Sequence, residues 1–352
     1  MKLEALAAAV LSLCAPLMAQ EAPPPFRFGG FANVTFDHST RTHHDAFAGG
    51  ELDLYASAAL SDNWSALAEG FIQHAGRVED VDQQPTKRVE VDLERFYIQY
   101  SPSDRMRLEL GQIHTGIIEW NEREHRSRFL QTPIDVPAIA TREEQGGAWP
   151  LHFVGLWSSG RLGGPLGVEY GAGIGEARGR ARDEIQPLLD EKSSPSQLVS
   201  LGVAPDAVPG WRLGAAEYGG DIPAPEGKMR EADLTAFTSY ERGGAELRGE
   251  WAQMHHRRLD DQQRYVTHGW YALASWRARG RWKPFRPYVL LDHLDVADGE
   301  PYLSEVRDQK AWAAGVRWDA KRWLAVKSDY RAQRSPEGKH EHLVRLQFAV
   351  SF

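Results

Sequence analysis

The sequence has almost no cysteine, no long apolar run after its first twenty residues and no excess of positive charge. Its single cysteine, Cys14, cannot form an intramolecular disulfide, so the fold does not rely on such bonds. No later stretch reaches the roughly 18–20 apolar residues that a membrane helix needs. The formal net charge of −8 argues against a general nucleic-acid binder. The GxSxG motif of many hydrolases is absent as well, and no serine and histidine are placed together by the sequence.

The first nineteen residues have the features of a secretory signal. Lys2 provides a weak basic start, and Ala5 to Leu13 form a short apolar core. Cleavage after Ala19 fits the usual recognition pattern imperfectly, and an ordinary N-terminal helix is the competing interpretation. We expect a signal peptide at 1–19 and an exported protein at 20–352, which would contain no cysteine because Cys14 is removed with the signal.

Alternation of apolar and polar residues with a period of two is abundant in the chain. Leu52 and Leu54, for example, alternate with Glu51 and Asp53. A period of two is typical of β-strands that have one apolar and one polar face. The mean hydropathy of −0.49 does not exclude a membrane barrel, because alternating strands dilute their own apolar signal.

The connections between the predicted strands fall into two classes. Short turns such as SPSD at Ser101 and ERGG at Glu241 alternate with long polar connections such as 39–47 and 116–146. This sorting is typical of an up-and-down barrel that spans an outer membrane, whereas a soluble sandwich has no reason to sort its loops. We therefore predict an all-β fold, a transmembrane antiparallel β-barrel of about sixteen strands, with fourteen to eighteen as the range. The predicted strands are 26–37, 48–60, 63–75, 88–100, 105–115, 147–159, 165–176, 196–204, 210–222, 231–241, 245–256, 265–278, 283–294, 309–319, 322–333 and 342–352.

The last predicted strand keeps its alternation to the final residue. Val344, Leu346, Phe348, Val350 and Phe352 share one face. An edge strand of a soluble sandwich and the closing strand of a barrel both fit this pattern. A closed barrel pairs its last strand with its first and leaves no exposed edge, which explains an apolar strand at this place.

The sequence resembles the sixteen-stranded porin superfamily of bacterial outer membranes, and within it the relatives of phosphate-selective porins. Three segments carry this resemblance: LERFYIQYSPSDRMRLELGQIHTGIIEWN, FLQTPIDVP and GGAWPLHFVGLWSSG. Outside 93–160 only the strand rhythm supports it. The final strand is similar to the assembly signal of outer-membrane proteins, which implies that role for Phe348, Val350 and Phe352.

The resemblance also implies a passive channel of the bacterial outer membrane without a cofactor. Such porins are commonly homotrimers. The implied partners are outer-membrane lipid, lipopolysaccharide and the outer-membrane assembly machinery, with no nucleic acid.

The connection from Gly116 to Gly146 is the predicted constriction of this channel. A long loop of a sixteen-stranded porin can fold into the lumen, and facing charges at a narrow point set ion selectivity. Arg123, Arg126 and Arg128 are the expected basic side of the constriction, although a solvated outer loop is the alternative for each of them. The expected wall residues are Glu51, Asp53, Glu90, Asp92, Arg95 and Arg107.

Several functions remain open at this point. Phosphate-selective porins carry rows of lumenal basic residues, whereas the lumenal acids and bases expected here are about equal in number. This balance favours a weakly selective channel for small polar or ionic solutes over a phosphate- or anion-selective porin.

A structural or adhesive barrel with a plugged lumen is another alternative. A barrel enzyme, such as a lipase or protease, would need a catalytic pair that the sequence does not indicate, so we expect a non-enzyme.

Two further motifs are weak. GAGIGEARG, from Gly171, resembles a dinucleotide fingerprint but lacks the strand-then-helix context that gives its glycines their role. The pairs His43–His44 and His255–His256 are expected in outer loops. Adjacent histidines can bind a metal, but the sequence fixes no third ligand. We therefore predict neither a cofactor nor a metal site.

Overall fold

The computed structural model describes residues 26–40, 44–75, 88–124, 129–179, 195–222, 227–334, 338 and 340–352. These residues form one closed antiparallel barrel of sixteen strands, so the predicted fold class and strand number are confirmed. The expected signal peptide lies outside the described residues. Within the described part of the chain, no helix has the length and apolar character needed to cross a membrane.

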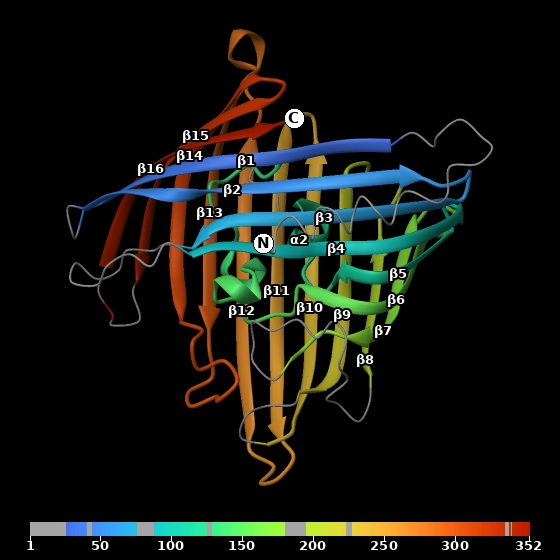
Figure 1. The fold of residues 1–352 in the computed structure, drawn as a ribbon. Helices are drawn as coiled ribbons and strands as arrows, with labels where there is room; N and C mark the ends of the chain where they lie inside the picture. The colour runs from blue at the N-terminus through green and yellow to red at the C-terminus, as the bar shows by residue number, and fades with distance from the viewer. Residues whose placement is uncertain are drawn as a thin grey trace, which may run out of the picture.

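The strands follow one another around the barrel in chain order (Figure 1). Their bounds are β1 Phe26–Ser39, β2 His44–Ala59, β3 Trp64–Ala75, β4 Arg88–Ser103, β5 Met106–His114, β6 His152–Arg161, β7 Val168–Glu176, β8 Ser196–Val203, β9 Trp211–Ile222, β10 Met229–Arg242, β11 Ala245–Arg258, β12 Arg264–Trp276, β13 Phe285–Asp295, β14 Gln309–Lys321, β15 Leu324–Arg334 and β16 His340–Ser351.

The two faces of the barrel wall have the reverse of the polarity found in a soluble sheet. Along β10 buried and exposed residues alternate. The buried set includes Glu231, Asp233 and Thr235, each 1% exposed, whereas Leu234 on the other face is 47% exposed. Charged residues are rarely buried in soluble proteins unless they are paired. An apolar outer face and a polar inner face suit a barrel whose outside meets hydrocarbon.

The barrel closes between β1 and β16. The backbone N–H of Gly30 donates to the carbonyl oxygen of Phe352 at 2.9 Å, and the N–H of Phe352 donates to Gly30 at 3.0 Å. Phe348 and Val350 also pair with residues of β1. The side chains of Phe348 and Phe352 are exposed on the outside. Pairing of the last strand with the first leaves no open sheet edge at this seam.

The two ends of the barrel differ in their connections. The turn end carries the short connections 60–63, 104–105, 162–167, 204–210, 243–244, 277–284 and 322–323, of which 277–284 includes η3 (Gly280–Trp282). In the hairpin between β10 and β11, Gly243 and Gly244 have φ angles of +64° and +91°. Two left-handed residues in succession make the two-residue turn that matches strand twist, and glycine adopts them without steric cost. We call the opposite end the loop end.

Three predicted boundaries were wrong at the loop end. The expected loop 39–47 is mostly strand, because β1 runs to Ser39 and β2 begins at His44. His255 and His256, expected in an outer loop, lie within β11, and pairing with β12 continues beyond them to Arg257. The sixth strand begins at His152 rather than at 147. In the first two cases backbone pairing continues past the apolar residues into polar ones, because unpaired N–H and C=O groups are costly.

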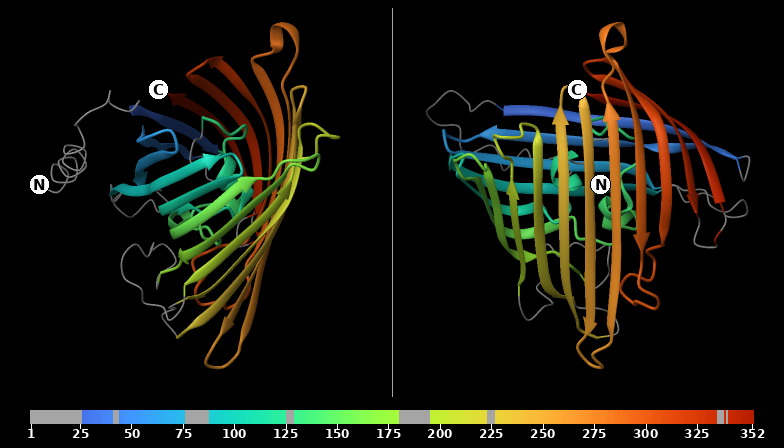
Figure 2. Two further views of the ribbon diagram at one scale, coloured as in Figure 1. Left: turned by 90° about the vertical axis from the view of Figure 1, so that its right-hand side faces the viewer. Right: turned by 180° about the vertical axis from the view of Figure 1, so that it is seen from behind.

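The connection between β5 and β6, residues 115–151, is the inward loop. It contains α2 (Glu119–Glu124), η1 (Ala138–Ala140) and η2 (Glu143–Gln145), and its residues 125–128 lie outside the described part. Figures 1 and 2 show this green segment between the front wall, formed by β1–β4, and the rear wall, formed by β10–β12.

Candidate solute pathway

The helix α2 is bound to the inner face of β10 and β11. The carboxylate of Glu250 accepts hydrogen bonds from the backbone N–H groups of Glu119 at 2.6 Å and Trp120 at 3.4 Å. The first N–H groups of a helix have no partner within the helix, so a wall carboxylate satisfies them here. Arg248 donates to Glu119 at 3.0 Å and also to Glu124. Burial raises the pKa of the Glu124 carboxyl above its ordinary value, although Arg248 opposes this shift.

The middle of the inward loop is held by cations of β14 and β15. Arg317 on β14 donates to the backbone carbonyls of Leu130 at 3.1 Å and Gln131 at 2.8 Å. Lys327 on β15 is fully buried and donates to the carbonyl of Pro133 at 3.0 Å. Because these cations bind loop carbonyls, they are not available to a solute in the lumen.

Cations of β15 and β16 also bind the inward loop. Arg331 and Arg345 both contact the carboxylate of Asp135, at 2.8 Å and 2.5 Å. Arg345 also makes an ion pair of 2.7 Å with Asp329, the cross-strand neighbour from β15. Arg331 also lies 3.7 Å from Asp292 on β13. Asp135 of the loop therefore joins a network of paired charges on the barrel wall.

The returning part of the inward loop approaches the opposite wall and then β7. The guanidinium of Arg142 lies 4.6 Å from the ring centroid of Phe71 on β3, a cation–π contact. Gln145 donates to Glu51 at 3.4 Å. Arg178, just after β7, donates to the carbonyl of Ala148 at 2.6 Å. The inward loop is thus held from both sides of the barrel.

The structure differs from the sequence prediction in the partners of the loop arginines. Arg123 forms a close ion pair with Glu241 at the turn end of β10, and its guanidinium lies 3.8 Å from Glu119. The predicted partners of Arg123 were acidic wall residues that include Glu51 and Asp53, so this prediction was wrong. Arg126 and Arg128 lie outside the described residues.

The predicted wall residues lie on β2, β4 and β5. The side chain of Glu90 lies outside the described residues, and Asp92 is half-buried opposite Phe71. Arg95 makes an ion pair of 2.7 Å with Glu69 on β3. Asp53 is buried, and Arg107 is exposed near the turn end of β5.

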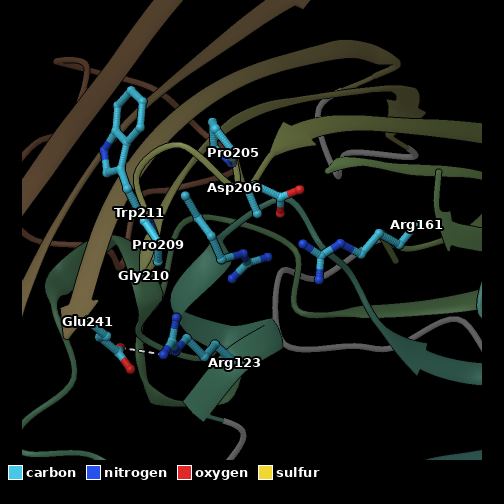
Figure 3. Close-up of a pocket in the computed structure, with 10 residues that line it drawn as sticks. Arg123, Arg161, Pro205, Asp206, Pro209, Gly210, Trp211 and Glu241 are labelled. Atoms are coloured by element: carbon cyan, nitrogen blue, oxygen red, sulfur yellow. Dashed lines mark ion pairs between the residues drawn. The ribbon is translucent and has the colours of Figure 1, made fainter. Parts of the chain in front are cut away.

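Two adjoining pockets at the turn end form a space that we call the vestibule. Their volumes are about 360 and 340 Å³, and both are lined by Arg161 at the end of β6. Arg123 and Arg161 extend toward a common space, where a dashed line marks the pair of Arg123 with Glu241 (Figure 3). The charged residues that line the vestibule are Asp104, Arg105, Arg123, Arg161, Asp206, Arg212 and Glu241.

The arginines of the vestibule are not equally neutralised. Arg123 is paired with Glu241, and Arg212 contacts Glu169 at 2.8 Å. Within the part of the chain that the structure describes, neither Arg105 nor Arg161 forms an ion pair. Neither residue was predicted as part of the constriction, because Arg105 lies in a short turn and Arg161 at a strand end, where no pattern indicates which charges meet.

One cluster of described residues could hold a metal ion. Glu94, His114 and His152 bring one ligand atom each to within 4.8 Å of one another. They come from β4, β5 and β6, so no spacing in the sequence could have revealed them. Of the two predicted histidine pairs, the side chains of His43 and His44 lie outside the described part of the structure.

No family model matches the chain, and no curated protein matches its sequence. Solved structures match almost its full length. The anion-selective porin from Comamonas acidovorans is 12% identical, with a TM-score of 0.64 over 93% of this chain and 99% of that one. The outer membrane channel DcaP of Acinetobacter baumannii is 10% identical, with a TM-score of 0.62 over 95% and 99%. OmpT, an outer membrane protein of Vibrio cholerae in its trimer form, is 8% identical, with a TM-score of 0.60 over 94% and 100%. The chain therefore has the sixteen-stranded barrel fold of the bacterial outer-membrane porins.

Proposed function

We propose that this protein is an outer-membrane porin, a passive and weakly selective diffusion channel for small polar or ionic solutes. The observation that carries the proposal is the inward loop, which contacts β10–β16 on one side and β2 and β3 on the other. A barrel of about sixteen strands is too wide to be filled by wall side chains alone, so a loop inside it narrows the passage. Such a narrowed lumen would screen solutes by size.

Weak selectivity follows from the charges along the accessible surface. The vestibule is lined by four arginines and three carboxylates, a small positive excess. Paired charges cancel much of each other's field beyond about one Debye length. A modest preference for anions fits this arrangement better than strong anion or phosphate selectivity, because several wall cations are bound to the inward loop.

A plugged structural barrel is the second candidate. The bonds of the inward loop to β10, β14 and β15 favour this candidate, since they hold the loop across the lumen. Conductance separates the two candidates. Purified protein in a planar lipid bilayer should give discrete conductance steps if the lumen conducts. Repeated insertion without any current would reject the channel and support the plugged barrel.

A loop-release variant sharpens this experiment. Arg317→Met removes the donor to three loop carbonyls, those of Phe129, Leu130 and Gln131, and should increase current fluctuation or conductance. Arg258→Met is the matched control, because Arg258 lies at the loop end, where it is half-buried and paired with Asp260. Equal traces for both variants would show that the inward loop does not set the conductance.

The remaining parts of the proposal concern partners and chemistry. We propose a homotrimer in contact with lipid and lipopolysaccharide, inserted by the outer-membrane assembly machinery, with no catalytic step. The fold is shared with a protein solved in a trimer form, which supports this assembly. Light scattering of the detergent-solubilised protein measures the stoichiometry, and a monomer at all concentrations would reject the trimer.

A further inference from the structure

We infer that Glu94, His114 and His152 form a binding site for a zinc-like transition-metal ion beside the inward loop. The Nε2 atoms of both histidines lie 3.0 Å from the same oxygen of Glu94, Oε1. Glu94 and His152 are fully buried, and 6% of the side chain of His114 is exposed. Two imidazole nitrogens and a carboxylate oxygen are a ligand set that zinc uses in proteins.

The distances suit a small metal ion. Zinc binds imidazole nitrogen and carboxylate oxygen at about 2.0–2.2 Å, so a tetrahedral ion separates its ligand atoms by about 3.3 Å. The three ligand atoms here lie within 4.8 Å of one another, and each nitrogen is 3.0 Å from the oxygen. The nitrogen–oxygen separations differ from this spacing by about 0.3 Å, and the widest separation in the cluster exceeds it by at most about 1.5 Å. Small rotations of the two histidine side chains would therefore bring all three atoms into coordination, with the fourth position left for water.

The local fold sets the direction of each ligand. His114 and His152 are cross-strand partners on β5 and β6, which places their rings side by side at 5.5 Å between centroids. Glu94 occupies a β-bulge, since Glu69 pairs with Arg95 while the next residue of β3 pairs with Leu93. A bulge redirects the side chain of its extra residue, which here points to the two histidines.

A hydrogen bond from Gln112 fixes this bulge. Its Nε2 donates to the backbone carbonyls of Leu93 at 2.6 Å and Glu94 at 3.0 Å. The backbone carbonyls of Leu93 and Glu94 thus accept hydrogen bonds from Gln112 and do not depend on pairing with β3. The position of the Glu94 carboxylate is therefore fixed by the backbone before any ion binds.

A second observation concerns the other nitrogen of His152. Its Nδ1 lies 3.4 Å from Oε2 of Glu143 in η2. A carboxylate beside Nδ1 orients the ring of a metal-binding histidine, so that the other nitrogen, here Nε2, faces the ligand cluster.

The ligand chemistry indicates the class of ion. Calcium and magnesium prefer oxygen ligands, whereas two imidazoles favour zinc, copper, nickel or cobalt. The ion would join β4, β5 and β6 at the root of the inward loop, and through Glu143 it would also fix η2.

The test measures metal binding to the refolded, detergent-solubilised full chain expressed without a histidine tag. Zinc titration by calorimetry gives stoichiometry and affinity, and the visible absorption of bound cobalt reports nitrogen and oxygen ligands in a tetrahedral site. We expect one ion per chain in the wild type. His114→Gln and His152→Asn should lose this stoichiometric binding, and each variant must first show the heat-dependent gel migration of a folded barrel.

Two further variants distinguish the site from general binding by histidines. Glu143→Gln keeps all three ligands and should weaken zinc affinity about 10- to 100-fold, the usual effect of losing a residue that orients a ligand. His268→Asn removes an exposed histidine 3.7 Å from Asp295 and should bind like the wild type. The inference is overturned if the wild type binds no zinc at micromolar concentration, or if the two ligand variants bind as it does.

Discussion

Replacing Arg161 by glutamine is the most direct probe of the vestibule. Arg161 lines both of its pockets and forms no ion pair among the described residues, so its charge acts on a passing ion without local compensation. Arg123 lines the same space but is paired with Glu241. Replacing either arginine by glutamine removes one positive charge from the vestibule. The charge of Arg123 is already neutralised by Glu241, whereas the charge of Arg161 is not.

The size of the effect follows from Coulomb's law. An ion passing about 6 Å from a guanidinium in water interacts with it by about 0.7 kcal/mol. Screening with a Debye length of about 10 Å, at 0.1 M salt, reduces this to roughly 0.4 kcal/mol. That energy changes the local concentration of each ion about twofold, in opposite directions for anions and cations. The ratio of anion to cation permeability should therefore fall about fourfold in Arg161→Gln.

Reversal potentials under a salt gradient measure this ratio. Arg161→Gln should shift the potential toward cation preference at low salt, and the shift should shrink at 1 M salt. Removing Arg123 leaves Glu241 uncompensated and shifts the potential in the same direction, with an added structural change at α2. Arg258→Gln, at the far loop end, is the control and should leave the potential unchanged. A potential for Arg161→Gln that matches this control would refute the assignment of the vestibule to the pathway.

Two further predictions concern assembly and stability. Phe352→Asp should lower the fraction of assembled barrel on a heat-modifiability gel, because the exposed ring lies beside the β1–β16 seam. The control Asp261→Asn, in an exposed turn, should leave this fraction unchanged. Equal assembled fractions for the two variants would show that Phe352 has no role in assembly. Arg178→Met should destabilise the barrel by about 3–5 kcal/mol in urea unfolding, because it leaves the buried Glu231 without its three hydrogen bonds from Arg178. Arg258→Met, which breaks an exposed ion pair, should cost less than about 1 kcal/mol, and similar losses for both would contradict this reasoning.

The alternation of residues was enough to predict the strands and their faces. Side chains of a strand point to opposite sides in turn, so residue number alone sets which ones face the lumen. Asp233 and Thr235 are buried and Leu234 is exposed, as their positions in the pattern indicate. Strand ends at the loop end were less predictable. Polar residues such as His255 continue the ladder as readily as apolar ones.

The sequence by itself determined the sixteen-stranded barrel, because its period of two is local and repeats in every strand. Only the tertiary structure decided which charges meet. Arg123 pairs with Glu241 rather than with the expected acidic wall, because the path of the inward loop depends on bonds to strands more than a hundred residues away. Glu94 meets His114 and His152 because a bulge and cross-strand pairing bring three strands together. Contacts of this kind arise when the barrel closes, and no local pattern in the chain encodes them.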